Sequence, residues 1–187
     1  MTITTSESNL NAIQHVLCAA RFAAERHSKQ RRKGAAAEPY INHLIEVAQL
    51  VSGALLEPDT DLVIAALLHD TIEDAGVTVE ELTERFGHDV AALVVEVTDD
   101  KLLSNEERKR LQIENAPKKP VRAQTIKLAD KISNMRAILT SPPVDWSERR
   151  KAEYFDWARQ VVDGFTAPNP MLKTEFAKTL NERMPRA

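Results

Sequence analysis

The chain has 187 residues and a formal net charge of −3, with 43% hydrophobic and 28% charged residues. This length supports one domain with a hydrophobic core but not two ordinary ones, and the slightly acidic balance argues against a dedicated nucleic-acid binder. No apolar run is long enough to cross a membrane, the N-terminus lacks a signal-peptide pattern, and the single cysteine, Cys18, excludes an internal disulfide framework and a Cys-rich zinc site. The expected location is therefore the cytoplasm.

Helical periodicity accounts for nearly the whole chain. After a loose tail over 1–6, a first helix is expected over 7–27, followed by a basic irregular stretch over 28–39. Further helices are expected over 40–56, 61–74, 78–87, 89–97, 105–114, 121–139, 147–164 and from 169 onward. The alternative for 94–98 is a short strand, which would have no partner. The predicted fold is all-α: one domain over 7–187, a bundle of about nine helices.

Capping residues set several of these boundaries. Thr78 with Glu81 forms a capping box, Ser147 is an N-cap, and Asn169 is an N-cap followed by Pro170 at the first helical position. The helix over 61–74 is apolar nearly all round in its first half, which predicts the central helix of the core.

Four side chains that carry chemistry lie near the end of that predicted central helix. His69 and Asp70 are adjacent, and Glu73 and Asp74 follow Asp70 by three and four residues, on the same side of a helix. Carboxylates so close together repel one another unless a cation compensates or a proton is shared. The cluster therefore predicts a functional site, and the alternative is a solvated acidic helix end.

Two further candidates lie on other predicted helices. Taken alone, His43 is most simply a satisfied histidine, and Asp130 is most simply the partner of Lys127 or Lys131 in an ion pair. Combined with the pair at the end of the central helix, they form an ordered set of two imidazoles and two carboxylates, which suits Mn²⁺, Fe²⁺ or Zn²⁺. Because the remaining histidines fall outside this pattern, one ion is expected. The four candidate ligands are His43, His69, Asp70 and Asp130.

This H…HD…D order is similar to the signature of the HD superfamily of metal-dependent phosphohydrolases. The chain further resembles, over about residues 8–165, the hydrolase domain of the Rel/SpoT alarmone enzymes, and in particular small alarmone hydrolases of the metazoan SpoT homologue type. The stretches that carry the resemblance are RRKGAAAEPYINH, AALLHDTIEDAGVTVEELTERFG, VVEVTDDK, ERKRLQ, IKLADKISNMR and WSERRKAEYFDWARQVV. The chain has no room for the synthetase and regulatory domains of the long Rel/SpoT proteins.

The resemblance implies hydrolysis of the 3′-pyrophosphate of guanosine tetra- or pentaphosphate, giving GDP or GTP and pyrophosphate, with Mn²⁺ as the usual metal and a role in the stringent response. By position it makes His43, His69, Asp70 and Asp130 the metal ligands. It makes Glu73 and Asp74 the catalytic acidic pair. It places Arg32 and Lys33 beside the nucleotide and assigns Asn134, Arg150 and Tyr154 to phosphate or base binding.

Three positions depart from the family pattern. Leu44 replaces a common proline, which affects only the helix entry, whereas Ser133 replaces an aromatic residue or histidine and Asn105 replaces a lysine. We expect the last two to bear on nucleotide preference and to leave the metal chemistry untouched.

The residues leave several alternatives open. The basic run at 31–33 has the alternative of a solvated loop, and Tyr154 that of core packing. The alternative functions are hydrolysis of another nucleotide, as an adenine alarmone hydrolase or an NADPH phosphatase, and a non-catalytic nucleotide-binding regulator. The expected partner is a small nucleotide substrate, without nucleic acid or membrane, and a homodimer is left open.

Overall fold

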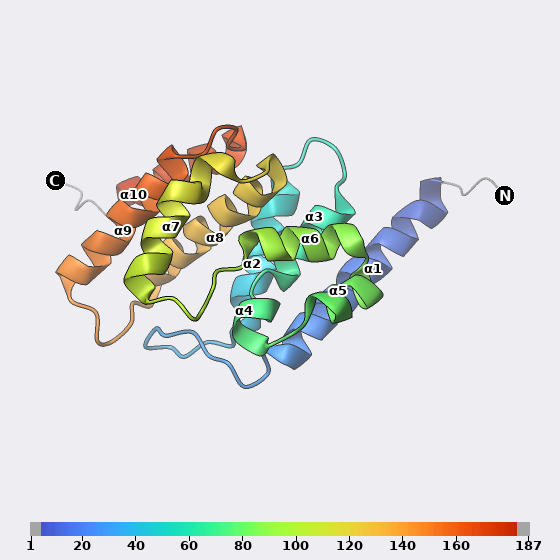
Figure 1. Ribbon diagram of the computed structural model, residues 1–187, viewed down its shortest axis with the longest axis horizontal. Coiled ribbons are helices and arrows are strands. Elements are labelled where there is room, and N and C mark those ends of the chain that lie inside the picture. Colours follow the sequence, from blue (N-terminus) through green and yellow to red (C-terminus); the bar gives the residue numbers. More distant parts are fainter. Residues whose placement is uncertain (1–4, 183–187) are drawn as a thin grey trace.

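The computed structural model describes residues 5–182, and this part of the chain is all-α, as predicted (Figure 1). It contains ten α-helices and one 3₁₀ turn, and its only β features are two isolated bridges. The helices are α1 (Thr5–Arg26), α2 (Ile41–Gly53), α3 (Thr60–Leu68), α4 (Thr71–Ala75), α5 (Val79–Phe86), α6 (His88–Val97), α7 (Asn105–Asn115), α8 (Val121–Thr140), α9 (Glu148–Asp163) and α10 (Pro170–Glu182), with the 3₁₀ turn η1 (Ala116–Lys118).

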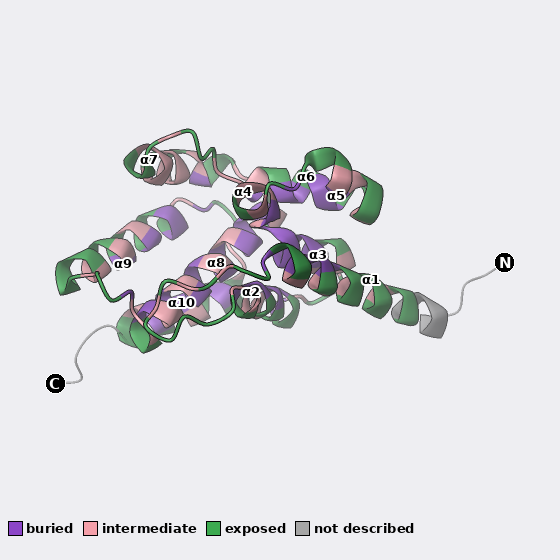
Figure 2. Ribbon diagram, turned by 90° about the horizontal axis from the view of Figure 1, so that it is seen from below, coloured by how far each residue is buried: buried purple, intermediate pink, exposed green. Residues whose placement is uncertain are grey.

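Two helices form the centre of the bundle. The apolar α3 packs against α1, α2 and α6, and α8 packs against α2, α6, α9 and α10. Figure 2 shows buried residues concentrated along α3 and α8, with exposed faces on the outer helices. Fully buried leucines and isoleucines such as Leu68, Leu128 and Ile132 each contribute about 1.5–3 kcal/mol relative to an exposed position. The prediction that the helix containing the apolar run 62–68 is central to the core is confirmed.

The predicted helix over 61–74 is wrong in one respect, because the structure divides it at His69 and Asp70. Asp70 has φ −100° and ψ 0°, outside the helical region, and α4 begins at the next residue. The Thr71 hydroxyl donates to the Leu68 carbonyl at 2.6 Å across the break. In a regular helix, consecutive side chains diverge by about 100°. The break instead allows the side chains of His69 and Asp70 to point at one place.

The predicted N-caps are present, but the capping box is only half formed. The Thr78 hydroxyl accepts from the Glu81 amide, whereas the Glu81 carboxylate pairs with Arg26 and Arg85. The Ser147 hydroxyl accepts from the Arg150 amide. Asn169 accepts from two amides of the first turn of α10, which begins at Pro170. The stretch over 94–98 belongs to the end of α6 and its cap, so the strand alternative is wrong.

Helix α1 extends beyond the body of the bundle (Figure 1). Ala19, Phe22 and Ala23 in its second half are buried, whereas Leu10 and Leu17 are exposed. Thr5 and Ser6, which fall in the expected tail, are helical; residues 1–4 and 183–187 lie outside the described residues. The division into a tail and a domain stays a prediction. Within 5–182, no helix is both long and apolar enough to cross a bilayer.

The basic stretch between α1 and α2 folds back on itself and on the end of α8. Arg31 forms an isolated bridge with Pro39, and Gly34 forms one with Pro143. The Ala36 amide donates to the Ser141 hydroxyl at 3.1 Å. These contacts hold the basic residues of the loop against the segment that follows α8.

Gly34 is the position in this loop where a side chain has no room. A Cβ at this residue would lie 2.0 Å from the Ser141 carbonyl oxygen, a backbone atom. We therefore expect Gly34→Ala to lower the free energy of unfolding by about 1–3 kcal/mol, the usual cost of overpacking. Urea denaturation measures the change. As a control, Gly53→Ala at the end of α2 meets nothing within 4 Å and is expected to be neutral or to stabilise by up to about 1 kcal/mol. Equal stabilities of the two variants would contradict the prediction.

Candidate active site and metal centre

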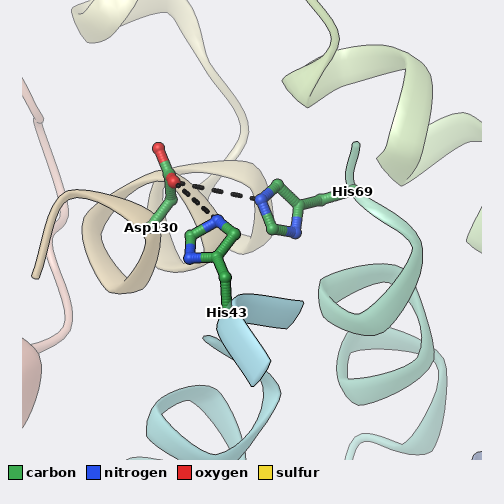
Figure 3. A group of neighbouring side chains, drawn as sticks. All are labelled: His43, His69 and Asp130. Carbon is green, nitrogen blue, oxygen red and sulfur yellow. Dashed lines mark ion pairs between the residues drawn. The ribbon is translucent and has the colours of Figure 1, made fainter. Parts of the chain in front are cut away.

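Three helices bring the first set of candidate ligands together. His43 lies in the first turn of α2, His69 directly follows α3, and Asp130 lies in the middle of α8. Figure 3 shows the two imidazoles and the carboxylate pointing at one another from these separate elements. Each offers one ligand atom, and the three atoms lie within 4.8 Å of one another. This grouping agrees with the sequence-based prediction for these three residues.

Asp70 faces the same point. Its Oδ2 lies 3.2 Å from His69 Nε2 and 3.7 Å from His43 Nε2. Asp130 Oδ1 lies 3.4 Å from His43 Nε2 and 3.9 Å from His69 Nε2. The Tyr40 hydroxyl also donates to Asp70 Oδ2, at 2.6 Å. The sequence pattern does not single out Tyr40, whose partner lies 30 residues further along the chain.

The donor atoms fit a divalent cation. His69 Nδ1 donates to the Ala66 carbonyl at 2.8 Å, and His69 Nε2 is buried without a hydrogen-bond partner. His43 Nδ1 lies 2.9 Å from the Ser133 hydroxyl, so that Nε2 faces the carboxylates. Imidazole nitrogens held from behind in this way, together with carboxylate oxygens, form a typical mixed site for a divalent transition metal.

The charges of the cluster also favour a cation. Burial lowers the pKa of His43, whereas for His69 the effect of burial is outweighed by the Asp70 carboxylate, which raises its pKa to about 9. Burial would raise the pKa values of both aspartates, yet His69 keeps that of Asp70 low, and Lys131 keeps that of Asp130 low. Both carboxylates are therefore ionised at neutral pH, and His69 must lose a proton before its Nε2 can ligate a metal.

The acidic pair lies on α4, immediately beyond the break. Glu73 Oε1 accepts from Arg108 Nη1 at 3.1 Å, and Glu73 Oε2 lies 3.4 Å from the Asp99 amide. Burial raises the pKa of the Glu73 carboxyl, and the charges of Asp70 and Asp99 raise it further. A raised pKa brings a carboxylate closer to the basicity that a general base needs near neutral pH.

Asp74 is held differently from Glu73. Its two oxygens accept from Gln30 Nε2 at 2.7 Å and from Lys101 Nζ. These partners, like Arg108, come from loops and helices distant in sequence. No spacing rule connects them to the acidic pair, so the sequence pattern alone does not reveal them.

A cleft of about 950 Å³ opens over this centre. Its lining includes the candidate ligands His69, Asp70 and Asp130 and the acidic pair Glu73 and Asp74. His43 is buried and is not part of the lining. All five residues predicted to contact the nucleotide line the cleft as well: Arg32, Lys33, Asn134, Arg150 and Tyr154. The structure therefore gathers every predicted site residue at one place.

Part of the cleft lining is basic and aromatic. Tyr154 lies between Trp146 and Trp157, with ring centroids 5.8 and 5.3 Å apart. The Arg150 guanidinium lies 4.8 Å from the centroid of Trp146, and Lys131 Nζ lies 4.5 Å from that of Trp157. Basic and aromatic side chains together suit a ligand that combines phosphates with a planar base.

Asn105 and Ser133, the two residues that differ from the family pattern and were expected to affect nucleotide preference, lie in different surroundings. Asn105 lines the cleft, in agreement with that expectation. Ser133 is buried and does not line the cleft, and its hydroxyl lies 2.9 Å from Nδ1 of the predicted ligand His43, so it contacts the metal centre's side rather than the nucleotide side. Its expected lack of effect on the metal chemistry stays a prediction. The ion-pair alternative for Asp130 holds in part, because Lys131 contacts its outer oxygen at 3.0 Å, while Lys127 instead pairs with Asp99.

The two histidines and two aspartates thus meet at one point of the helical domain, from α2, from the break between α3 and α4, and from α8. The model of the HD-domain family matches residues 19–155. The chain is 49% identical over 158 residues to the guanosine-3′,5′-bis(diphosphate) 3′-pyrophosphohydrolase MESH1 of Xenopus tropicalis, covering 84% of this chain and 88% of that protein. It is 46% identical to the protein of the same name from Homo sapiens, covering 90% and 94%.

A solved structure agrees with these relatives. The structure of a metazoan ortholog of SpoT, described as hydrolysing ppGpp and playing a role in starvation responses, superposes with a TM-score of 0.86 and 39% identity and covers 98% of both chains. This chain therefore belongs to the HD-domain family and, within it, to the family of the MESH1 proteins.

Proposed function

We propose that this protein hydrolyses guanosine 3′,5′-bis(diphosphate) and its pentaphosphate analogue at the 3′ position, releasing pyrophosphate and GDP or GTP. The observation that carries the proposal is the position of Glu73, which lines a cleft with basic residues together with the His/Asp centre and interacts with the charge of Asp70. The names of two similar relatives and of the metazoan structure support the same reaction.

The proposed metal ligands are His43, His69, Asp70 and Asp130, around one divalent ion, with Mn²⁺ as the proposed identity. When bound, such an ion lowers the pKa of water and stabilises negative charge on phosphoryl oxygens. The mixed nitrogen and oxygen donors suit Mn²⁺ but do not distinguish it from Fe²⁺ or Zn²⁺.

A cytoplasmic setting belongs to the same proposal and is supported by the free, exposed Cys18. A homodimer stays a prediction.

The chain's own residues then perform the proton transfer. Glu73 accepts a proton from the water whose oxygen attacks the phosphorus bonded to the ribose 3′ oxygen. The bond from this phosphorus to the 3′ oxygen breaks, and the 3′ oxygen takes up a proton from solvent while Glu73 returns its proton to solvent, so that one water is consumed in total. Arg108 orients Glu73, and Asp74 is proposed to hold Lys101 at the edge of the cleft. A positioned base of this kind contributes about 10²–10⁴-fold to the rate.

The remaining cleft residues are proposed to bind the substrate. Arg32 and Lys33 on the loop before α2, and Arg150 on α9, supply positive charge for the phosphates. Asn134 lies one turn after Asp130, where it contacts that carboxylate and faces the cleft. Tyr154 lies between two tryptophans and is proposed to contact the base or a phosphate.

A substrate panel tests this proposal. The protein with Mn²⁺ is offered guanosine tetraphosphate, the corresponding adenine nucleotide and NADPH, and phosphate and pyrophosphate are quantified separately. We expect the highest kcat/KM with guanosine tetraphosphate and pyrophosphate as the only inorganic product. Faster release of phosphate from NADPH, or preference for the adenine nucleotide, would contradict the guanine assignment, and Asn105 would then be the first position to examine. Binding without turnover of any substrate would favour a regulator.

A further inference from the structure

A chain of hydrogen bonds runs from His43 away from the cleft. The His43 Nδ1 atom lies 2.9 Å from the Ser133 hydroxyl, which lies 2.6 Å from Glu46 Oε2. The other oxygen of Glu46 accepts from Arg136 at 3.0 Å, and Arg136 also donates to Glu175 on α10 at 2.5 Å. These hydrogen bonds therefore link one ligand of the proposed metal centre to residues of three helices, α2, α8 and α10.

At neutral pH, only one set of donor and acceptor roles is possible for the hydrogen bonds that connect His43, Ser133, Glu46 and Arg136. Arg136 only donates, so the Glu46 carboxylate accepts from it. The same ionised carboxylate must also accept the single proton of the Ser133 hydroxyl, which leaves the Ser133 oxygen as an acceptor. In the neutral ring that metal ligation requires, His43 must then carry its proton on Nδ1, the nitrogen that faces Ser133. The lone pair of Nε2 is consequently directed toward Asp70 and Asp130.

We propose that Ser133 and Glu46 are positioning residues that lock His43 in the tautomer and ring orientation needed to ligate the metal. The negative charge of Glu46, relayed through the Ser133 hydroxyl, also raises the basicity of His43 Nε2, as carboxylates behind metal-bound histidines do. His69 receives the equivalent support from the Ala66 backbone carbonyl. The inference rests on the metal centre of the proposed function but not on its substrate.

The position of Ser133 shows why a side chain different from the family pattern is accommodated there. Ser133 is 1% exposed, and its small hydroxyl fits between α8 and α2. Glu46 lies three residues after His43, on the same side of α2, so the serine and the carboxylate meet behind one imidazole. We infer that these two positions act as a pair in this chain.

The test measures metal binding without nucleotide, so that its outcome does not depend on the proposed substrate. Free Mn²⁺ is titrated with metal-stripped protein and followed by electron paramagnetic resonance. Ser133→Ala is expected to raise the Kd for Mn²⁺ about 10–100-fold, the range typical for loss of such a supporting group. Ser133→Thr, which keeps the hydroxyl, is expected to restore most of the affinity. Glu46→Gln, which keeps the shape and removes the charge, is expected to lie between them.

A second readout reports the tautomer directly. The ¹⁵N shifts of the His43 ring in the metal-free protein are expected to show a proton on Nδ1 in the natural chain and a mixture of tautomers in Ser133→Ala. The matched control is Ser52→Ala, which removes an exposed hydroxyl from the same helix α2 and is expected to change neither readout.

Two results would overturn the inference: an unchanged Kd in both Ser133→Ala and Glu46→Gln, or an unchanged His43 tautomer in the alanine variant. If Ser133→Ala does not fold, Glu46→Gln decides the question alone, because it fills the same volume. A failure of the proposed reaction would leave these metal titrations unaffected, so the two failures are distinguishable.

Discussion

Replacement of Glu73 by glutamine is expected to lower kcat by about 10²–10⁴-fold, the usual contribution of a general base, while the protein still binds one equivalent of metal. The amide keeps the shape of the side chain and a hydrogen-bond acceptor for Arg108 but cannot take a proton. Because Glu73 lies beside the His/Asp centre rather than among its nearest nitrogen and oxygen atoms, the Kd for Mn²⁺ should change little. Steady-state kinetics with guanosine tetraphosphate and metal analysis of the same samples measure the two effects.

The matched control for this variant is Glu84→Gln on α5, an exposed glutamate outside the cleft. It makes the same chemical change and should leave turnover and metal content as they are. Near-normal turnover in Glu73→Gln would show that another group accepts the proton. Loss of metal together with turnover would instead place Glu73 among the ligands.

Replacement of His69 by alanine is expected to remove both the metal and the activity. Its Nε2 is buried without a hydrogen-bond partner and faces the carboxylates of Asp70 and Asp130, so the variant loses one of the four proposed ligands. Since the metal contributes several kcal/mol to stabilising charge in the reaction, we expect turnover to fall by about 10³-fold or more. The metal content after dialysis, measured by mass spectrometry, should fall in parallel.

The control for the histidine variant is His15→Ala on the exposed part of α1, which removes an imidazole far from the cleft. It is expected to retain full metal content and turnover. A His69→Ala variant that kept its metal and most of its activity would mean that the centre is not the one assigned here.

Much of the fold was accessible from local patterns in the sequence. The boundaries at Thr78, Ser147 and Asn169 follow from hydrogen bonds between a side chain and an amide two or three residues away, so they can be read without knowledge of the tertiary structure. The candidate ligands could be proposed because imidazoles and carboxylates are costly to bury on otherwise apolar helices unless they are paired or bind a metal.

The break at His69 and Asp70 could not be predicted in this way. The apolar run before it and the acidic residues after it are both compatible with one continuous helix, and the cost of leaving the helix is offset by tertiary contacts such as the Tyr40 hydroxyl on Asp70. The role of Ser133 could not be predicted for the same reason. Its partner His43 lies 90 residues away, and only the packing of α2 on α8 brings them together.

The exposed leucines of α1 show a further limit of periodicity. Leu10, Ile13 and Leu17 recur at helical spacing, yet they remain 57–64% exposed, while Ala19 and Phe22 on the opposite side of the helix are buried. Periodicity shows that large apolar residues share one face of a helix, whereas the packing of the neighbouring helices decides which face is buried.

The most direct test of the proposed reaction is an assay of metal-stripped protein with guanosine tetraphosphate, with and without Mn²⁺, in which nucleotides, phosphate and pyrophosphate are resolved by anion-exchange chromatography. A metal-dependent 3′-pyrophosphohydrolase should give GDP and pyrophosphate in equal amounts, formed only when Mn²⁺ is added. Equal turnover without metal, release of single phosphates, or no turnover by protein that contains a full equivalent of Mn²⁺ would contradict the assignment.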